Sequence, residues 1–299
     1  MKILVTGASS LPGYKCVVEA LSRGHEVVAL HFTHEIPCEH RALRKIRLDI
    51  TDTMRLKDLI VKERPEIVYH IAAYGDVDGC ERDRRKAWKI NVEATVALAE
   101  ASELVNAFVV YLSTDYVFDG ERGMYREDEP PCPVNYYGLT KLMGEVAVMS
   151  RCSRWAVVRA SSIYGLGPGR KNFAKFLIEK LSKGEPVKAL VDQYTSPSNS
   201  KLLAEALLEI GEYAKTGVFH IVGERMSRYE FAIRLAETLG FDKSLIGEAR
   251  MSDFKWFAKR PRDSSLSYEY TRGRMLVDFY SNARAFSVLK EEYEAMLKR

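Results

Sequence analysis

The first third of the chain alternates short apolar runs with longer amphipathic stretches, and this alternation constrains the fold more than any other feature. Residues 3–5 and 27–30 read as buried strands, and residues 16–21 between them read as the apolar face of a helix. Parallel strands need a crossover connection, which is usually a helix. The opening of the chain therefore predicts βαβ units and a parallel sheet.

The same pattern continues far enough to define a whole sheet. Three more apolar runs of strand length follow, and three amphipathic stretches of helical length lie among them. The predicted strands are 67–72, 108–112 and 156–159, and the predicted helices are 54–62, 88–102 and 137–149. Five short strands with crossover helices predict a doubly wound, Rossmann-type α/β fold with a mostly parallel sheet.

The regular alternation of strands and helices stops after Gly165, where a glycine-rich run precedes a mixture of predicted helices and short strands. We predict a dinucleotide-binding domain over 1–164 and a smaller, mainly substrate-binding lobe over 165–299, with segments that partly return to the first domain. No flexible linker and no internal repeat separates them. In the second half we expect helices at 173–181, 201–213 and 229–239, a strand at 187–191, and an irregular polar region at 252–275.

Composition argues against several classes of protein. A chain of 299 residues with 46% hydrophobic content can bury a large core, and a net charge of +4 is too balanced for nucleic acid as the main partner. The sequence lacks the pattern of a signal peptide and any run near the roughly 20 apolar residues of a membrane span. The five cysteines show no disulfide or zinc spacing, so we expect a cytoplasmic protein without a metal site.

One dense basic cluster comprises Arg82, Arg84, Arg85 and Lys86. Acidic residues are interleaved with it and a helical pattern follows. We interpret the cluster as a solvated helix face, with a binding patch as the alternative.

A glycine loop at residues 6–13 follows the first predicted strand and opens the first predicted helix. Gly7 permits a tight turn, Gly13 permits close packing of helix on strand, and the helix N-terminus offers N–H groups and positive charge to a pyrophosphate. Ser10 stands where such loops usually carry their middle glycine, although its hydroxyl could donate to the phosphates. An ordinary strand-to-helix turn is the alternative. The position of the glycine loop in the first thirteen residues of an alternating α/β chain favours a dinucleotide site.

The segment after the second predicted strand bears on the choice of dinucleotide. NAD-specific folds usually carry an acid there to bind the ribose 2′-OH, and residues 29–33 contain none. We therefore favour NADP, with NAD as the alternative. Asp49 could accept from the adenine amino group or could simply cap its loop. The basic side chains that could meet a 2′-phosphate are His31, His34, Arg41, Arg44 and Lys45.

A candidate acid–base pair lies on the helix predicted at 137–149. Tyr137 and Lys141 are four residues apart and therefore share a helix face. A nearby cation favours phenolate and lowers the pKa of a tyrosine, which could then protonate a carbonyl oxygen as hydride reaches its carbon. Thr114 follows the strand at 108–112, at the sheet end where ligands sit, and could donate to the same oxygen. A chance Tyr–Lys spacing and a loop-capping threonine are the alternatives.

These residues together resemble the extended short-chain dehydrogenase/reductase family, and within it the branch of dTDP-4-dehydrorhamnose reductases. The resemblance covers nearly the whole chain, and the run Ser-Thr-Asp-Tyr-Val-Phe followed by Tyr-Gly-x-Thr-Lys is its most specific part. The matching stretches are 6–13, 71–73, Asn91, 113–118, 136–141 with Gly144 and Glu145, 192–194 and 260–266.

The resemblance implies a homodimeric enzyme that reduces a nucleotide-linked 4-keto-sugar with NAD(P)H, most simply dTDP-4-dehydrorhamnose in dTDP-L-rhamnose biosynthesis. It implies Tyr137 as the proton donor, Lys141 as the group that lowers its pKa and holds the nicotinamide ribose, and Thr114 as a second donor to the keto oxygen. The implied cofactor-binding residues are Gly7, Ser9, Ser10, Leu11, Gly13, His31, Asp49, Ile50, Ala72, Ala73, Tyr74, Asn91, Tyr137 and Lys141. The implied substrate-binding residues are Thr114, Asp115, Tyr116, Ser162 and Arg260.

Other members of the family provide the alternatives. Tyr116 stands where sugar-nucleotide 4,6-dehydratases carry a carboxylate, which argues against dehydration. The missing acid after the second strand argues against an epimerase that recycles bound NAD, which stays a minor alternative. Ser162 replaces a tryptophan expected to pack on the sugar, so the sugar's identity is open. The branch also includes the non-catalytic regulatory subunit of methionine adenosyltransferase, so a regulatory role is the second alternative.

Overall fold

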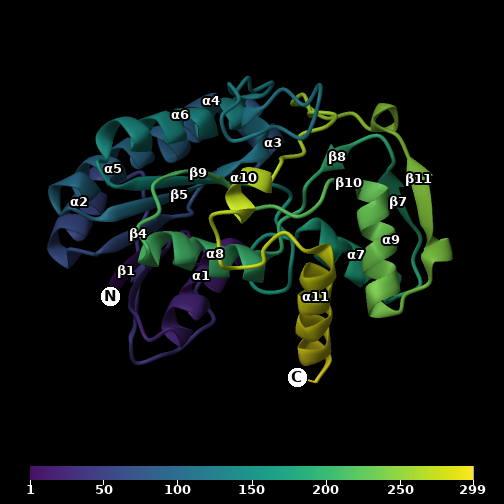
Figure 1. The fold of residues 1–299 in the computed structure, drawn as a ribbon, viewed down its shortest axis with the longest axis horizontal. Helices are drawn as coiled ribbons and strands as arrows, with labels where there is room; N and C mark the ends of the chain where they lie inside the picture. The colour runs from purple at the N-terminus through teal and green to yellow at the C-terminus, as the bar shows by residue number, and fades with distance from the viewer. Residues whose placement is uncertain (299) are drawn as a thin grey trace.

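The computed structural model describes residues 1–298, and Arg299, the last residue of the predicted lobe, lies outside the described residues. Seven parallel strands form the central sheet in the order β3-β2-β1-β4-β5-β6-β9 (Figure 1). This arrangement confirms the predicted doubly wound α/β fold. The strands are β1 (Lys2–Thr6), β2 (Glu26–His31), β3 (Leu43–Arg47), β4 (Ile67–His70), β5 (Phe108–Thr114), β6 (Trp155–Ala160) and β9 (Gly217–His220).

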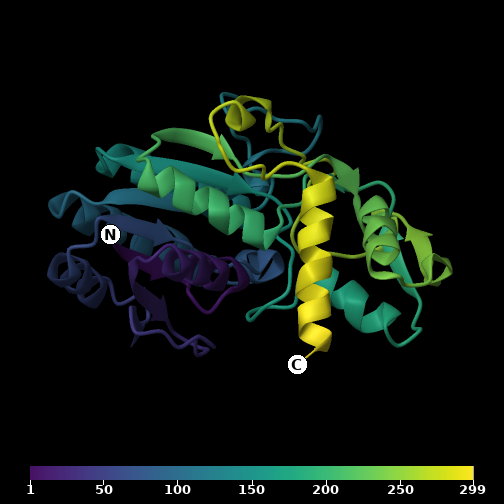
Figure 2. The same ribbon diagram turned by 60° about the horizontal axis from the view of Figure 1, so that its bottom comes forward.

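Helices cover both faces of this sheet (Figures 1 and 2). Alternate side chains of β1 enter different cores: Ile3 and Val5 belong to the cluster shared with α1 and α8, whereas Leu4 belongs to the cluster shared with α2, α5 and α6. Because both faces are buried, the strands read as continuous apolar runs in the sequence. The covering helices are α1 (Leu11–Ser22), α2 (Thr53–Glu63), α5 (Ala94–Leu104), α6 (Tyr136–Arg151) and α8 (Ser200–Glu212).

The sequence pattern missed the two edge strands of the sheet. β3 reads Leu-Arg-Lys-Ile-Arg, and basic side chains are typical of an edge strand that is protected from pairing with other chains. β9 has only four residues, too few for a clear period. It pairs with β6, so the second half of the chain contributes a strand to the sheet of the first.

The connection between β4 and β5 contains α3 (Val77–Arg82), α4 (Arg84–Trp88) and a π-helical turn (Lys89–Glu93) that continues into α5. The helix predicted at 88–102 is therefore present, with a π turn at its beginning. Such turns recur at functional sites, and this one carries Asn91. None of the helices in residues 1–298 has both the length and the apolar character of a membrane span.

The rest of the second half forms a smaller lobe at the right of Figure 1. A parallel pair and an antiparallel pair of short strands accompany its helices. The sequence analysis assigned no structure to the last helix, α11, which contacts α1 through the Lys15–Glu292 ion pair and α9 through Phe286 and Phe231. The elements are α7 (Phe173–Leu181), β7 (Val187–Leu190), β8 (Tyr194–Thr195), β10 (Met226–Ser227), α9 (Arg228–Leu239), β11 (Ile246–Ala249), α10 (Glu269–Arg272) and α11 (Asn282–Leu297).

Candidate active site

The glycine loop between β1 and α1 is packed too tightly for side chains at its two glycines. Gly7 has a φ of +65°, and a Cβ added there would lie 2.7 Å from Cα of Ala72. A Cβ on Gly13 would lie 2.2 Å from the carbonyl oxygen of Gly7. The loop thus approaches the end of β4 backbone to backbone, and this cradle fits the phosphates of a dinucleotide.

Ser10 has a different role from the one predicted. Its hydroxyl donates to the carbonyl oxygen of Gly7 at 2.7 Å and accepts from the N–H of Gly13 at 3.2 Å, so that it caps α1. The first turn of a helix has N–H groups without partners, and a serine at the N-cap satisfies one of them. The Ser10 hydroxyl is therefore engaged within the loop and does not point its proton toward a phosphate.

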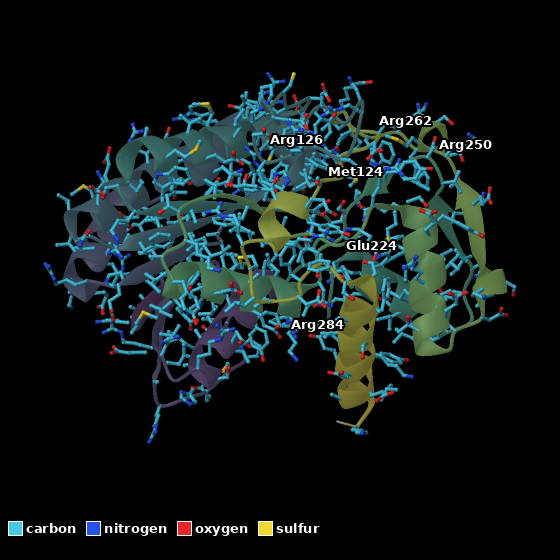
Figure 3. All side chains as sticks on the ribbon, in the orientation of Figure 1. Met124, Arg126, Glu224, Arg250, Arg262 and Arg284 are labelled. Carbon is cyan, nitrogen blue, oxygen red and sulfur yellow. The ribbon has the colours of Figure 1, made fainter. Side chains whose placement is uncertain are left out.

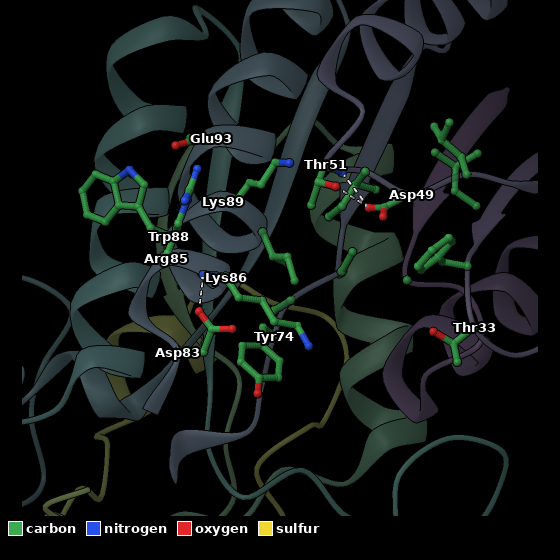
Figure 4. Close-up of a pocket in the computed structure, with 18 of the residues that line it drawn as sticks. Thr33, Asp49, Thr51, Tyr74, Asp83, Arg85, Lys86, Trp88, Lys89 and Glu93 are labelled. Carbon is green, nitrogen blue, oxygen red and sulfur yellow. Dashed lines mark hydrogen bonds between the residues drawn. The ribbon is translucent and has the colours of Figure 1, made fainter. Parts of the chain in front are cut away.

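A cavity of about 940 Å³ lies beside this loop at the carboxyl ends of β1, β2 and β4, and we call it the first cavity (Figure 4). It has the position at which doubly wound sheets bind ligands. Asp49 caps its own loop, because its Oδ1 accepts from the N–H and the hydroxyl of Thr51 at 2.9 and 2.8 Å. Seven of the predicted cofactor-binding residues line this cavity: Gly7, His31, Asp49, Ile50, Ala72, Ala73 and Tyr74.

The basic cluster is exposed, as the prediction of a solvated helix face requires, and part of it also lies at the rim of the first cavity. Arg85, Lys86 and Lys89 line the cavity, while Arg84 forms an ion pair with Glu81 (Figure 4). The Lys86 ammonium lies 4.7 Å from the ring centroid of Tyr74. Arg85 and Lys89 are four residues apart, and this spacing in the sequence could have predicted that they share a helix face.

Of the side chains predicted to meet a 2′-phosphate, only His31 lines the first cavity. Its Nδ1 lies 3.1 Å from the carbonyl oxygen of His34. Arg44 is paired with Glu63, and Lys45 is bonded to an acid in the preceding loop. Both cations are therefore paired with acidic side chains outside the first cavity.

Thr114 and Tyr137 are brought together from β5 and α6. Thr114 is the last residue of β5 and Tyr137 lies in the first turn of α6, and the Thr114 side chain lies near enough to influence the pKa of the Tyr137 hydroxyl. The ring of Tyr116 packs edge-on to that of Tyr137, with 6.0 Å between centroids. Gly138 permits this approach, since a Cβ there would lie 2.0 Å from the Tyr116 carbonyl oxygen. Two hydroxyl groups thus meet at the carboxyl end of the sheet.

Lys141 is almost fully buried, with 2% of its surface exposed, and its ammonium lies 4.1 Å from the ring centroid of Tyr111. Burial lowers the pKa of Lys141 to about 7, although the Glu145 carboxylate opposes this. Burial also raises the pKa of Tyr137, and the nearby Thr114 side chain is the main influence that opposes this. The phenol of Tyr137 therefore keeps its proton in this state, and the lowering of its pKa by Lys141 stays a prediction.

Asp115 is turned into the protein and is 2% exposed, and its contact with a substrate stays a prediction. Its Oδ1 accepts from the Thr114 hydroxyl at 3.0 Å, and its Oδ2 accepts from the hydroxyls of Ser161, at 2.8 Å, and Ser264. Burial raises the pKa of Asp115, whereas these three donors lower it. The carboxylate therefore joins the ends of β5 and β6 to the segment before α10.

That segment is also fixed to the loop after β5. The Met124 N–H donates to the Ser265 hydroxyl at 2.8 Å, and Figure 3 labels Met124 and Arg262 on the two segments. Arg260 was predicted to bind substrate, but its Nη2 lies 3.0 Å from Oδ1 of Asp78. Its guanidinium thus fastens the segment to α3, because a half-buried cation is stabilised by a nearby carboxylate.

Asn91 supports the wall of the first cavity from behind. Its Oδ1 accepts from the N–H of Tyr74 at 2.7 Å, and its Nδ2 donates to the Thr140 hydroxyl at 2.9 Å. With 1% of its surface exposed, it has no free face for a cofactor. In this structure Asn91 holds Tyr74 in place, and its contact with a cofactor stays a prediction.

A buried ion pair fixes α6 against the sheet. Arg159 on β6 donates two hydrogen bonds to Glu145, from Nε at 3.0 Å and from Nη2 at 2.8 Å. Ser113 donates to the same carboxylate at 2.5 Å. Because Glu145 follows Lys141 by one helical turn, the pair also sets the position of the lysine.

A further cavity of about 640 Å³ opens toward the lobe, and we call it the second cavity. Ser162, a predicted substrate residue, lines it with a φ of +43°, which is unusual for a residue with a side chain. The sequence analysis missed its aromatic walls. These are two stacked pairs, Phe173 with Phe176 at 6.3 Å and Phe254 with Trp256 at 5.8 Å between centroids.

Comparisons with known proteins agree with this geometry. The family described as RmlD substrate binding domain matches residues 1–287. The probable low-salt glycan biosynthesis reductase Agl14 of Haloferax volcanii is 33% identical over 280 residues, 92% of each chain. The methionine adenosyltransferase 2 subunit beta of Pongo abelii is 30% identical, over 89% of this chain and 80% of that one. A structure of dTDP-4-dehydrorhamnose reductase from Bacillus anthracis in complex with NADP has a TM-score of 0.86 and 26% identity, over 98% and 99% of the two chains.

Proposed function

Because the chain belongs to the RmlD substrate-binding-domain family, we propose that it is an NAD(P)H-dependent reductase of a nucleotide-linked 4-keto-sugar. The resemblance stated from the sequence is thereby confirmed. The activity that the relatives support is that of dTDP-4-dehydrorhamnose reductase, and the cofactor is NADP or NAD.

The observation that carries this proposal is the nearness of Thr114, at the end of β5, to Tyr137 on α6, the helix that also carries buried Lys141. Two hydroxyl donors at one point suit a carbonyl oxygen that gains negative charge as its carbon is reduced. The first cavity, next to the glycine cradle, provides the place for a dinucleotide at the same end of the sheet.

Bound NADPH supplies the hydride in this scheme. The carbonyl carbon accepts the hydride, and the Tyr137 phenol gives its proton to the carbonyl oxygen, which becomes a hydroxyl. Thr114 stabilises the developing charge by donating to the same oxygen. The charged form of Lys141 stabilises the phenolate that remains, and solvent returns its proton. In this proposal Asp115 and Asn91 only hold these groups in place.

We further propose that the two parts of the chain bind different ligands. Residues 1–164 bind the dinucleotide, and the lobe within 165–299 binds the substrate, while β9 and α8 return to the first part. We place the enzyme in the cytoplasm, since all five cysteines are free thiols, and we propose a homodimer. Sedimentation of the purified protein measures the dimer directly.

The test of the proposed function is NADPH and NADH oxidation at 340 nm with dTDP-4-dehydrorhamnose. We expect turnover by the wild type and a loss of roughly 10²- to 10⁴-fold in kcat for Tyr137→Phe, because the proton donor is removed while the ring is kept. The affinity for NADPH should be unchanged in this variant. Wild-type protein that binds NADPH and reduces no nucleotide-linked keto-sugar would refute the proposal.

A second candidate is a regulatory role, favoured by the 30% identity to the methionine adenosyltransferase 2 subunit beta. In that case the chain binds a dinucleotide and a partner enzyme without turnover. The presence of Thr114, Tyr137 and Lys141 at the same end of the sheet argues for catalysis. A stable complex with a methionine adenosyltransferase, together with no turnover, would favour the regulatory role.

A further inference from the structure

Arg228 is an arginine without a counter-ion at the wall of the second cavity. It is the first residue of α9 and is partly buried, and its guanidinium lies 5.3 Å from the ring centroid of Phe173. Within residues 1–298 no side-chain hydrogen bond or ion pair engages it. Burial lowers the pKa of Arg228, and the nearby Tyr116 and Asp115 oppose this.

Such an arrangement is unusual for an arginine. A guanidinium has five N–H donors, and partly buried charges in proteins are normally paired and hydrogen-bonded. The other buried arginine of the site, Arg159, is paired with Glu145. The difference between the two indicates that the acceptor of Arg228 comes from outside the chain.

The position of Arg228 indicates what kind of acceptor this is. The second cavity has stacked aromatic side chains on its walls, Phe173 with Phe176 and Phe254 with Trp256, which suit a planar base. The cavity is also bounded by Ser162, whose neighbour Ser161 is bonded to Asp115 beside Thr114. Arg228 therefore lies between an aromatic compartment and the reacting hydroxyls.

We propose that Arg228 binds an oxyanion of the substrate and thereby selects substrates that carry a negative charge between the planar base and the reacting carbon. A guanidinium matches the geometry of phosphate and carboxylate through two parallel hydrogen bonds. The oxyanion is either the diphosphate that links base and sugar or a carboxylate on the sugar itself. This inference rests on the proposed function for the class of substrate, a nucleotide-linked sugar.

The test is calorimetric binding of thymidine, dTDP and dTDP-glucuronate to the full chain and to Arg228→Gln. If the oxyanion is the diphosphate, the variant loses roughly 30-fold or more in affinity for both dTDP and dTDP-glucuronate and keeps its affinity for thymidine. If the oxyanion is the carboxylate, only dTDP-glucuronate loses affinity. Arg234→Gln, on an exposed position of the same helix, is the matched control and should change none of the three.

Thermal unfolding separates this role from a structural one. A structural arginine would lower the unfolding midpoint when replaced, whereas removal of an unpaired charge should leave the midpoint of Arg228→Gln equal or higher. Equal affinity of the variant and the wild type for both anionic ligands would overturn the inference. Because binding is measured without turnover, failure of the reductase proposal and failure of this inference are distinguishable.

Discussion

Replacing Lys141 by methionine should stabilise the protein without cofactor while it abolishes turnover. The lysine is 2% exposed and lies among Tyr111, Glu145 and the sheet, so that its charge is held where water cannot reach it. Methionine has a similar length, carries no charge and fits irregular apolar gaps. The substitution therefore removes a buried charge and retains most of the packing.

The expected size of the effect follows from two opposing contributions. A shift of the Lys141 pKa from its ordinary 10.5 to about 7 corresponds to a destabilisation of at most about 4 kcal/mol at pH 7. The contact of the ammonium with the Tyr111 ring offsets up to about 2 kcal/mol of this, and that contact is lost in the variant. We therefore expect Lys141→Met to raise the free energy of unfolding by about 2 kcal/mol at pH 7.

The pH dependence gives the sharper check. Between pH 7 and 10.5 the folded wild type binds fewer protons at Lys141 than the unfolded chain, so wild-type stability rises with pH across this window. The advantage of the variant should accordingly shrink toward pH 10.5. Urea unfolding at pH 7, 8.5 and 10 measures it, with Lys290→Met as an exposed control. A variant that is less stable at pH 7, by an amount that does not change with pH, would refute the reasoning.

Two substitutions test the cradle and the buried ion pair. Gly13→Ala should cost about 1–3 kcal/mol of stability and weaken NADPH binding in a fluorescence titration, because its Cβ would lie 2.2 Å from the Gly7 carbonyl oxygen. Gly247→Ala is the control, since the nearest atom to a Cβ there lies at 3.7 Å. Equal losses in both variants would contradict this prediction. Glu145→Gln should cost about 3–5 kcal/mol in urea unfolding, because it leaves Arg159 buried without its partner. The double variant with Arg159→Met should recover much of that loss, and no recovery would argue against the pair as the cause.

The sequence alone predicted the parts of the structure that depend on local periodicity. The five buried strands and the nearness of Thr114 to Tyr137 followed from apolar runs and from the rule that ligands sit at the carboxyl ends of parallel strands. The edge strand β3 escaped because its exposed edge permits basic side chains. A strand that is covered on both faces can be predicted from its continuous apolar run, whereas an edge strand often cannot.

The internal roles of several site residues could not be predicted, because their partners are distant in the chain. Ser161 and Ser264, which donate to Asp115, lie 46 and 149 residues away from it. The walls of the second cavity likewise combine Phe173 with Trp256 from an irregular region that has no period. Motif matching found Asp115 and Asn91 but not the direction in which their side chains point, which depends on tertiary packing.

The central claim, that this chain transfers a hydride from the cofactor to a keto-sugar, is tested most directly by isotope transfer. NADPH with deuterium at the transferable position is incubated with dTDP-4-dehydrorhamnose and the wild-type protein, and the sugar product is analysed by mass spectrometry and NMR. The account predicts one deuterium on the carbon that was the carbonyl carbon and that now carries the new hydroxyl. It predicts no deuterium in the sugar with Tyr137→Phe over the same time. A reduced sugar without deuterium, or deuterated NADPH that is never consumed, would contradict it.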